Sequence, residues 1–282
     1  MQEEWTEIIT PQAHPFQLGI KQLWRYRDLL VLFVKRDLTA QYKQTILGPL
    51  WNIIQPAFTT FVFLMVFNKI AKIPTDTLPP VIFYMSGLTI WNYFSSCLTT
   101  TSSTFVSNAA IFGKVYFPRL ILPLSGVVSN LAKFGIQFGL LLVVMIWFVL
   151  FKNYTIPFGW HTLLIPVIAI IMAALGLGLG IIISSLTTKY RDFTILISFG
   201  VQLLMYATPV AYPLSYVAKS KYRVLIEWNP LSPLIEGFRY ALFGSGTFTA
   251  GLFIYSILFS FFTLILGMFI FNKVERNFMD TV

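Results

Sequence analysis

The sequence predicts an all-α integral membrane protein with six spans, and three features of the chain support this fold class. Of its 282 residues, 56% are hydrophobic and only 11% are charged, whereas a soluble domain carries about 25% charged residues. The apolar segments are long and continuous, as helices that cross a bilayer must be. The basic residues, which give a net charge of +9, lie mostly at the ends of these segments, where they orient a membrane protein. This distribution argues against nucleic-acid binding.

The part of the chain before the first span contains two segments. Residues 1–15 form a polar, acidic tail that lacks the charged-then-apolar plan of a cleaved signal peptide. Residues 16–47 predict an amphipathic helix, because apolar and basic residues recur on opposite sides at helical spacing. Such a helix suits the cytoplasmic membrane interface, although a buried helix of a small soluble domain would show the same pattern. Gly48-Pro49 then ends it.

Residues 48–282 form the transmembrane domain. The second span has a polar end at 99–103, the fifth is short, and the third is long enough to tilt. Basic residues of the N-terminal segment and the inner loops outnumber those of the outer loops, so we expect both termini in the cytoplasm. The six predicted spans lie near 50–69, 80–103, 120–150, 162–186, 193–212 and 249–271.

The longest outer segment, about 213–248, is apolar but too short to cross the membrane. It predicts re-entrant or interfacial helices packed against protein, because unpaired backbone groups are costly in lipid. Ser232 before Pro233 predicts a helix start with the serine as N-cap. Glu236 and Arg239, three residues apart, are expected to pair on the polar side of that helix.

The sequence contains few of the residues and motifs that form disulfides, metal sites or nucleotide-binding sites. The single Cys97 excludes an intramolecular disulfide and a cysteine metal cluster, and His14 and His161 are too distant to suggest zinc. The sequence contains no phosphate-binding loop of the G-x-x-x-x-G-K-[ST] type. We therefore expect no catalytic residue, metal or cofactor in this chain. The glycines inside spans predict close helix packing rather than a dinucleotide loop; they are Gly135, Gly139, Gly176, Gly178 and Gly180.

The energy source of any transport is expected to lie outside the chain. No Asp or Glu lies in the middle of a predicted span, whereas ion-coupled transporters usually carry such acids there. The pattern leaves a channel, a scaffold or a transporter driven by a partner. Lys133 is the one charge well inside a span; it either extends toward the cytoplasmic surface or lines an aqueous path for an anionic substrate.

Four segments, spread in order from about residue 30 to the end, carry a family resemblance. They are Val34–Trp51 continuing to Gln55-Pro56, Lys114–Pro123, Tyr190-Arg191-Asp192 and Asn229–Arg239. With these segments the chain resembles ABC-transporter permeases of the polysaccharide-export class, which export O-antigen, related cell-surface glycans or teichoic acids.

The resemblance implies a non-catalytic subunit of an exporter that moves a lipid-linked polysaccharide across the bacterial inner membrane. It implies a homodimer bound to two copies of a separate ATPase subunit, which holds the ATP and Mg. The interfacial helix, the spans and the short outer helices follow from the residues as well. The dimer and the ATPase follow from the resemblance alone.

Residue roles follow from the resemblance in three groups. Cytoplasmic residues would dock on the ATPase, although the basic ones would also serve as membrane anchors; they are Phe112, Lys114, Tyr116, Phe117, Arg119, Tyr190, Arg191 and Asp192. The substrate path would be lined by aromatics, each of which would otherwise face lipid, together with Lys133; they are Phe61, Trp91, Tyr93, Phe94, Phe138 and Tyr206. The outer gate would contain Tyr212, Tyr216, Trp228, Glu236, Arg239 and Tyr240.

Three other functions stay open on the sequence. An exporter of a drug or small lipid has the same general plan but would not need the family segments. A membrane enzyme acting on lipid-linked sugars would place acids or a histidine near an interface for acid–base work or metal binding. A channel or scaffold would not copurify with an ATPase.

Overall fold

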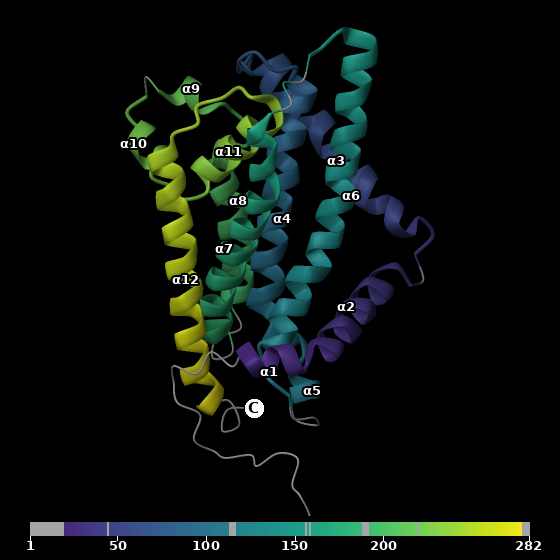
Figure 1. Ribbon diagram of the computed structural model, residues 1–282, viewed down its shortest axis with the longest axis vertical. Helices are drawn as coiled ribbons and strands as arrows, with labels where there is room; N and C mark the ends of the chain where they lie inside the picture. Colours follow the sequence, from purple (N-terminus) through teal and green to yellow (C-terminus); the bar gives the residue numbers. More distant parts are fainter. Residues whose placement is uncertain are drawn as a thin grey trace, which may run out of the picture.

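The computed structural model is a bundle of helices joined by turns (Figure 1). It describes residues 20–43, 45–112, 117–155, 157, 159–187, 192–218 and 220–277. Over these residues the secondary structure is helical and contains no strand, which confirms the predicted all-α class. The predicted N-terminal tail, residues 1–15, lies outside the described residues.

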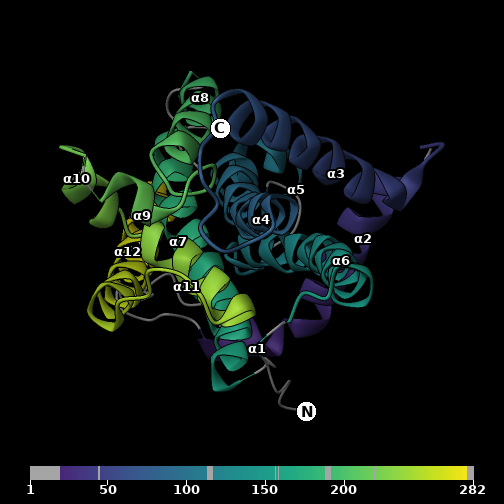
Figure 2. The same cartoon turned by 90° about the horizontal axis from the view of Figure 1, so that it is seen from above.

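Most long helices run along the vertical axis of Figure 1, α3 (Trp51–Phe63) crosses obliquely (Figure 2), and short helices gather at the two ends. The lower end carries α1 (Ile20–Arg25), α2 (Arg27–Tyr42) and α5 (Ala109–Phe112). The upper end carries α9 (Leu214–Val217), α10 (Arg223–Glu227) and α11 (Ser232–Phe243). The long elements are α3 (Trp51–Phe63) with its π-helical continuation Leu64–Ile70, α4 (Pro80–Ser107), α6 (Ile121–Lys152), α7 (Leu164–Thr187), α8 (Phe193–Tyr206) and α12 (Ala250–Asn277).

Four helical segments are long and apolar enough to cross a membrane; they are Gly48–Ile70, Ile121–Lys152, Trp160–Thr187 and Ala250–Lys273. They coincide with the first, third, fourth and sixth predicted spans and are candidates for crossing by their length and composition. The second prediction corresponds to α4, which is long but less apolar. The fifth corresponds to α8, an apolar helix of 14 residues. The count of six therefore stays a prediction.

Helix α4 is the centre of the bundle, as the view down the long axis shows (Figure 2). It packs against α3, α6, α7, α8 and α11, and nearly every residue from Ile82 to Phe94 is buried. Because its neighbours are helices rather than lipid, α4 tolerates polar residues that a lipid-facing helix would not. This position explains why its hydropathy is lower than that of the other long helices.

Glycines permit the closest helix contacts of the bundle. A Cβ on Gly176 or Gly180 would lie 2.8 or 2.5 Å from Cys97 or Thr101 of α4. On the opposite side of α7, a Cβ on Gly178 would lie 2.7 Å from the backbone nitrogen of Leu264 in α12. The predicted close packing is thus confirmed for these three glycines. It is wrong for Gly135 and Gly139 within the described chain, because a Cβ on either would meet no atom of another helix within 4 Å.

The predicted amphipathic segment is helical where the structure describes it, with an interruption at Tyr26 between α1 and α2. Helix α2 lies across the lower part of α6, with which it makes its main contact (Figure 1). Phe33 is the buried residue of α2, and its ring lies 5.6 Å from that of Phe117. The location of α2 in a membrane interface stays a prediction.

Candidate functional site

The upper end of the bundle contains a buried ion pair within α11. The side chains of Glu236 and Arg239 are 3% and 2% exposed, and their Oε1 and Nη1 atoms are 2.9 Å apart. Arg239 also donates from Nη1 to the carbonyl of Pro209 at 2.7 Å and from Nη2 to that of Val210 at 2.8 Å. The guanidinium therefore ties α11 to the turn that follows α8.

Helix α4 completes the environment of this pair. The guanidinium carbon of Arg239 lies 3.7 Å from the ring centroid of Phe83, in a cation–π contact. Gly87 leaves room for the arginine, since a Cβ there would lie 2.7 Å from Nη2. Glu236 Oε1 also accepts a hydrogen bond from the backbone nitrogen of Leu214 at 3.4 Å. Burial raises the pKa of the Glu236 carboxyl, while the guanidinium of Arg239 opposes that rise.

Two expectations for this segment need correction. Glu236 and Arg239 do pair at i and i+3, but they are buried rather than on a polar face, because α4 and the post-α8 turn cover that side of α11. Ser232 is not a side-chain N-cap: the helix begins at Ser232 itself, and the hydroxyl has no hydrogen-bond partner among the described residues.

The sequence reasoning missed Asn229, which organises the start of α11. Its Oδ1 accepts from the backbone nitrogen of Leu231 at 3.1 Å, closing an Asx-type turn. Its Nδ2 donates to the carbonyl of Ala207 and the hydroxyl of Thr208, both at 3.1 Å. The dipeptide Asn229-Pro230 predicts a turn at this point, because Asn before Pro favours turn initiation.

The aromatic residues assigned to the outer gate differ in exposure. Tyr216 and Trp228 are exposed, whereas Tyr212 is partly buried and donates its hydroxyl to the carbonyl of Tyr206 at 3.0 Å. Tyr240 is partly buried and stacks on Phe248 with ring centroids 4.9 Å apart. Of the four aromatic residues assigned to the gate, Tyr216 and Trp228 present open ring surface.

The residues assigned to the substrate path fall into two sets. Trp91, Tyr93 and Phe94 are buried in α4. The ring of Tyr93 lies 5.0 Å from that of Phe134. Phe138, on α6, is partly buried, and its ring lies 6.2 Å from that of Phe238. By contrast, Phe61 on α3 and Tyr206 on α8 are exposed. These two helices lie on one side of α4, with α11 on the other (Figure 2).

Four of the eight residues assigned to ATPase docking lie outside the part of the chain that the structure describes. Lys114, Tyr116, Tyr190 and Arg191 lie outside the described residues, and Phe112 is described only as the last residue of α5. Phe117 is buried against Phe33 of α2, Arg119 is partly buried, and Asp192 is exposed just before α8. The described members near α5 lie at the same end of the bundle as α1 and α2 (Figure 1).

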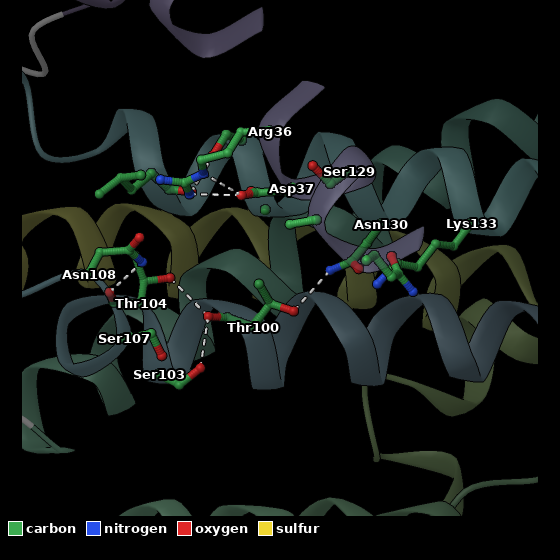
Figure 3. Close-up of a pocket in the computed structure, with 15 residues that line it drawn as sticks. Arg36, Asp37, Thr100, Ser103, Thr104, Ser107, Asn108, Ser129, Asn130 and Lys133 are labelled. Atoms are coloured by element: carbon green, nitrogen blue, oxygen red, sulfur yellow. Dashed lines mark hydrogen bonds and ion pairs between the residues drawn. The ribbon is translucent and has the colours of Figure 1, made fainter. Parts of the chain in front are cut away.

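A polar cavity of about 630 Å³ lies between α2, α4 and α6 (Figure 3). Hydroxyl and amide side chains from α4 and α6 make up most of its lining, together with one acid and two bases. The polar lining residues are Arg36, Asp37, Gln41, Thr100, Ser103, Thr104, Ser107, Asn108, Ser125, Ser129, Asn130 and Lys133. We refer to this space as the polar cavity.

Of the residues around the polar cavity, the sequence reasoning singled out only Lys133. A signal for the others is present in the polar run at 99–103, which on its own predicts only a polar end of the second span. Ser129, Asn130 and Lys133 also stand at i, i+1 and i+4, a spacing that places Ser129 and Lys133 on one helix face. Over the described residues, no three His, Cys, Asp or Glu side chains come together as metal ligands would.

In a comparison with known protein families, residues 28–243 match the family described as "ABC-2 type transporter". The chain is 32% identical over 255 residues to an O-antigen export system permease protein, RfbA, of Klebsiella pneumoniae, with 90% of this chain and 94% of the relative covered. It is 30% identical to RfbA of Myxococcus xanthus over 78% of this chain and 82% of that relative. A polysialic acid transport protein, KpsM, of Escherichia coli is 21% identical over 87% of this chain and 93% of that relative.

Proposed function

The chain belongs to the family of ABC-2 type transporters, and from this membership we propose that it is the transmembrane subunit of an ATP-driven exporter. We propose that the exporter moves a lipid-linked polysaccharide, O-antigen-like or teichoic acid-like, across the bacterial inner membrane. The observation that carries this proposal is the similarity to an O-antigen export permease over 90% of the chain. The KpsM relative, named for polysialic acid transport, points to the same class of substrate.

The proposed division of labour assigns ATP and Mg to a separate ATPase subunit. The sequence has no phosphate-binding loop, and its apolar helices α3, α4, α6, α7 and α8 carry no acid. Such helices offer no carboxylate for coupling transport to a proton or sodium ion. We therefore propose a homodimer of this chain bound to two ATPase copies, with no catalytic residue in the chain itself.

The proposed topology has six spans, with α4 and α8 as the second and fifth and both termini in the cytoplasm. The 28 residues of α4 reach about 42 Å at 1.5 Å per residue, which exceeds the ~30 Å hydrocarbon core. The lower end of Figure 1, which carries α1, α2 and α5, is then cytoplasmic and faces the ATPase. The upper end, with α9, α10 and α11, then faces outward.

The proposed path lies along the face formed by α3 and α8 over α4. Both helices expose aromatic rings there, including Phe61 and Tyr206, and a second copy placed against this face would enclose a channel. Sugar rings present apolar C–H faces that aromatic side chains cover without holding them tightly. Tyr216 and Trp228 then stand at the outer exit, held by the α11 framework.

The test is ATP hydrolysis by the purified chain, alone and with the ATPase subunit encoded beside its gene. We expect no hydrolysis by the chain alone, and a stable complex whose hydrolysis rises when a lipid-linked glycan is added. Stimulation by small lipids or drugs instead of the glycan would reassign the substrate class. A chain that binds no ATPase subunit would overturn the exporter assignment.

A further inference from the structure

We propose that the polar cavity binds the phosphate or diphosphate headgroup of a lipid, with Lys133 and Ser129 as its principal contacts. The inference rests on the proposed function where that lipid is the carrier of the glycan. It does not rest on it where the lipid is a phospholipid of the membrane. The argument starts from the depth, the charge and the unused hydrogen-bonding groups of the cavity.

The polar cavity reaches from the lower end of the bundle toward its middle. Its lining on α6 runs from Leu122 to Lys133, which is about 16 Å of helix at 1.5 Å per residue. Its lining on α4 runs from Thr100 to Ser107 and continues to Asn108, which follows the helix. Figure 3 shows Asn130 and Lys133 extending from α6 toward α4, opposite Thr100. A ligand at Lys133 would therefore lie about 16 Å along α6 from the lower end of the cavity.

The charge of the cavity favours an anion. Arg36 and Asp37 neutralise each other, because Asp37 Oδ1 accepts from both Nε and Nη2 of Arg36, at 2.9 and 2.7 Å. Asp37 also attracts the Lys133 ammonium, but no hydrogen bond or ion pair joins Lys133 to any residue that the structure describes. The lining thus holds two positive charges and one negative charge.

The unused hydrogen-bonding groups point to the same site. Ser129 is only 5% exposed, and its hydroxyl has no hydrogen-bond partner among the described residues. It stands one helical turn before Lys133 on the same face of α6. A buried hydroxyl without a partner is unfavourable, and a ligand or water in the cavity would supply the missing hydrogen bond. Beside it, Asn130 donates to the hydroxyl of Thr100 at 3.2 Å, which orders the wall.

A phosphate group satisfies both unused groups together. Its oxygens accept charge-assisted hydrogen bonds from an ammonium and from a hydroxyl at once. A neutral sugar would leave the lysine charge in a low-dielectric region without an anion, which is costly. A lipid is favoured over a free phosphate ion because the cavity lies along membrane-spanning helices and is walled on one side by α2.

The test is a lipid titration of the purified full-length protein in detergent, followed by native mass spectrometry. The probes are a long-chain isoprenoid diphosphate, phosphatidylglycerol and neutral diacylglycerol. We expect Lys133→Met to weaken binding of the phosphate lipids about tenfold, the loss of one charge-assisted hydrogen bond. Lys133→Arg should retain most of the affinity. Lys152→Met, at the far end of α6, is the matched control and should bind as the native protein does.

The two phosphate probes separate the possible sources of the headgroup. Preference for the isoprenoid diphosphate assigns the cavity to the glycan carrier, and preference for phosphatidylglycerol assigns it to a membrane phospholipid. The inference is overturned if Lys133→Met binds both phosphate lipids as the native protein does, or if diacylglycerol binds equally well. Glycan-stimulated ATP hydrolysis by the native complex, measured in parallel, shows whether the proposed function survives such a failure.

Discussion

Replacing Arg239 with methionine should strongly destabilise the upper end of the bundle in Figure 1. The substitution removes the partner of a carboxylate that is 3% exposed and the donors to two backbone carbonyls at 2.7 and 2.8 Å. Breaking a buried ion pair by removing one member costs about 3–5 kcal/mol, because a charge is left buried without compensation. We expect a loss of that size in the free energy of unfolding of Arg239→Met.

The second member of the pair provides the decisive comparison. In the double variant Glu236→Leu/Arg239→Met the orphaned carboxylate is gone, so part of the loss should be recovered, giving a coupling energy of about 1–3 kcal/mol. Recovery should be incomplete, because the carbonyls of Pro209 and Val210 still lack their donor. Glu236→Gln is the mild control, since an amide oxygen still accepts from Arg239 and from the backbone nitrogen of Leu214.

The assay is the free energy of unfolding by SDS titration in mixed micelles, combined with limited proteolysis of the turn after α8. Arg239→Met should expose that turn to protease, and Glu236→Gln should not. The reasoning is refuted if the double variant is as unstable as the single Arg239→Met. It is also refuted if Arg239→Met and the native protein unfold at the same SDS concentration, because the pair would then contribute nothing measurable to the free energy of unfolding.

Three further predictions follow from single contacts. Gly178→Ala should lower the free energy of unfolding, because its Cβ would lie 2.7 Å from the α12 backbone. Gly135→Ala, where the added Cβ meets no other atom within 4 Å, should raise the free energy of unfolding by up to about 1 kcal/mol. Equal effects of the two substitutions would contradict the packing. Phe117→Ala should cost about 3–5 kcal/mol by the same SDS titration, because the ring is buried against Phe33, and a loss below ~1 kcal/mol would leave it free for docking. Asn229→Ala, which removes three hydrogen bonds, should cost about 1–3 kcal/mol and speed proteolysis before α11; unchanged cleavage would contradict its role.

The spans that face lipid were the most predictable elements. The middle and upper part of α6 carries exposed apolar side chains, such as those of Val143, Ile146 and Leu150. A continuous run of apolar residues in the sequence predicts such a helix. Helix α4 was harder to predict because other helices, not lipid, surround it. Its polar residues lower the hydropathy signal on which span prediction depends, although its position requires no apolar surface toward lipid.

The orientation of side chains around a helix was less predictable than the helix itself. The i, i+3 spacing of Glu236 and Arg239 correctly predicted their pairing, but nothing local in the sequence states that α4 and the post-α8 turn cover that side. For the same reason the burial of Trp91 and Tyr93 was not predictable. An aromatic side chain in a span looks the same whether it faces lipid, a path or the core.

The polar cavity could be predicted from the sequence only by considering two spans together. A polar run in one span and a lysine in another each look like a local weakness when read alone. In the structure the two are halves of one wall, because α4 and α6 pack together and Asn130 bonds to Thr100. Polar groups at membrane depth are costly unless they meet one another, water or a ligand. Two polar stretches in separate spans are therefore better interpreted together. Ser129 and Lys133 are the members of this pair whose polar groups no described residue satisfies.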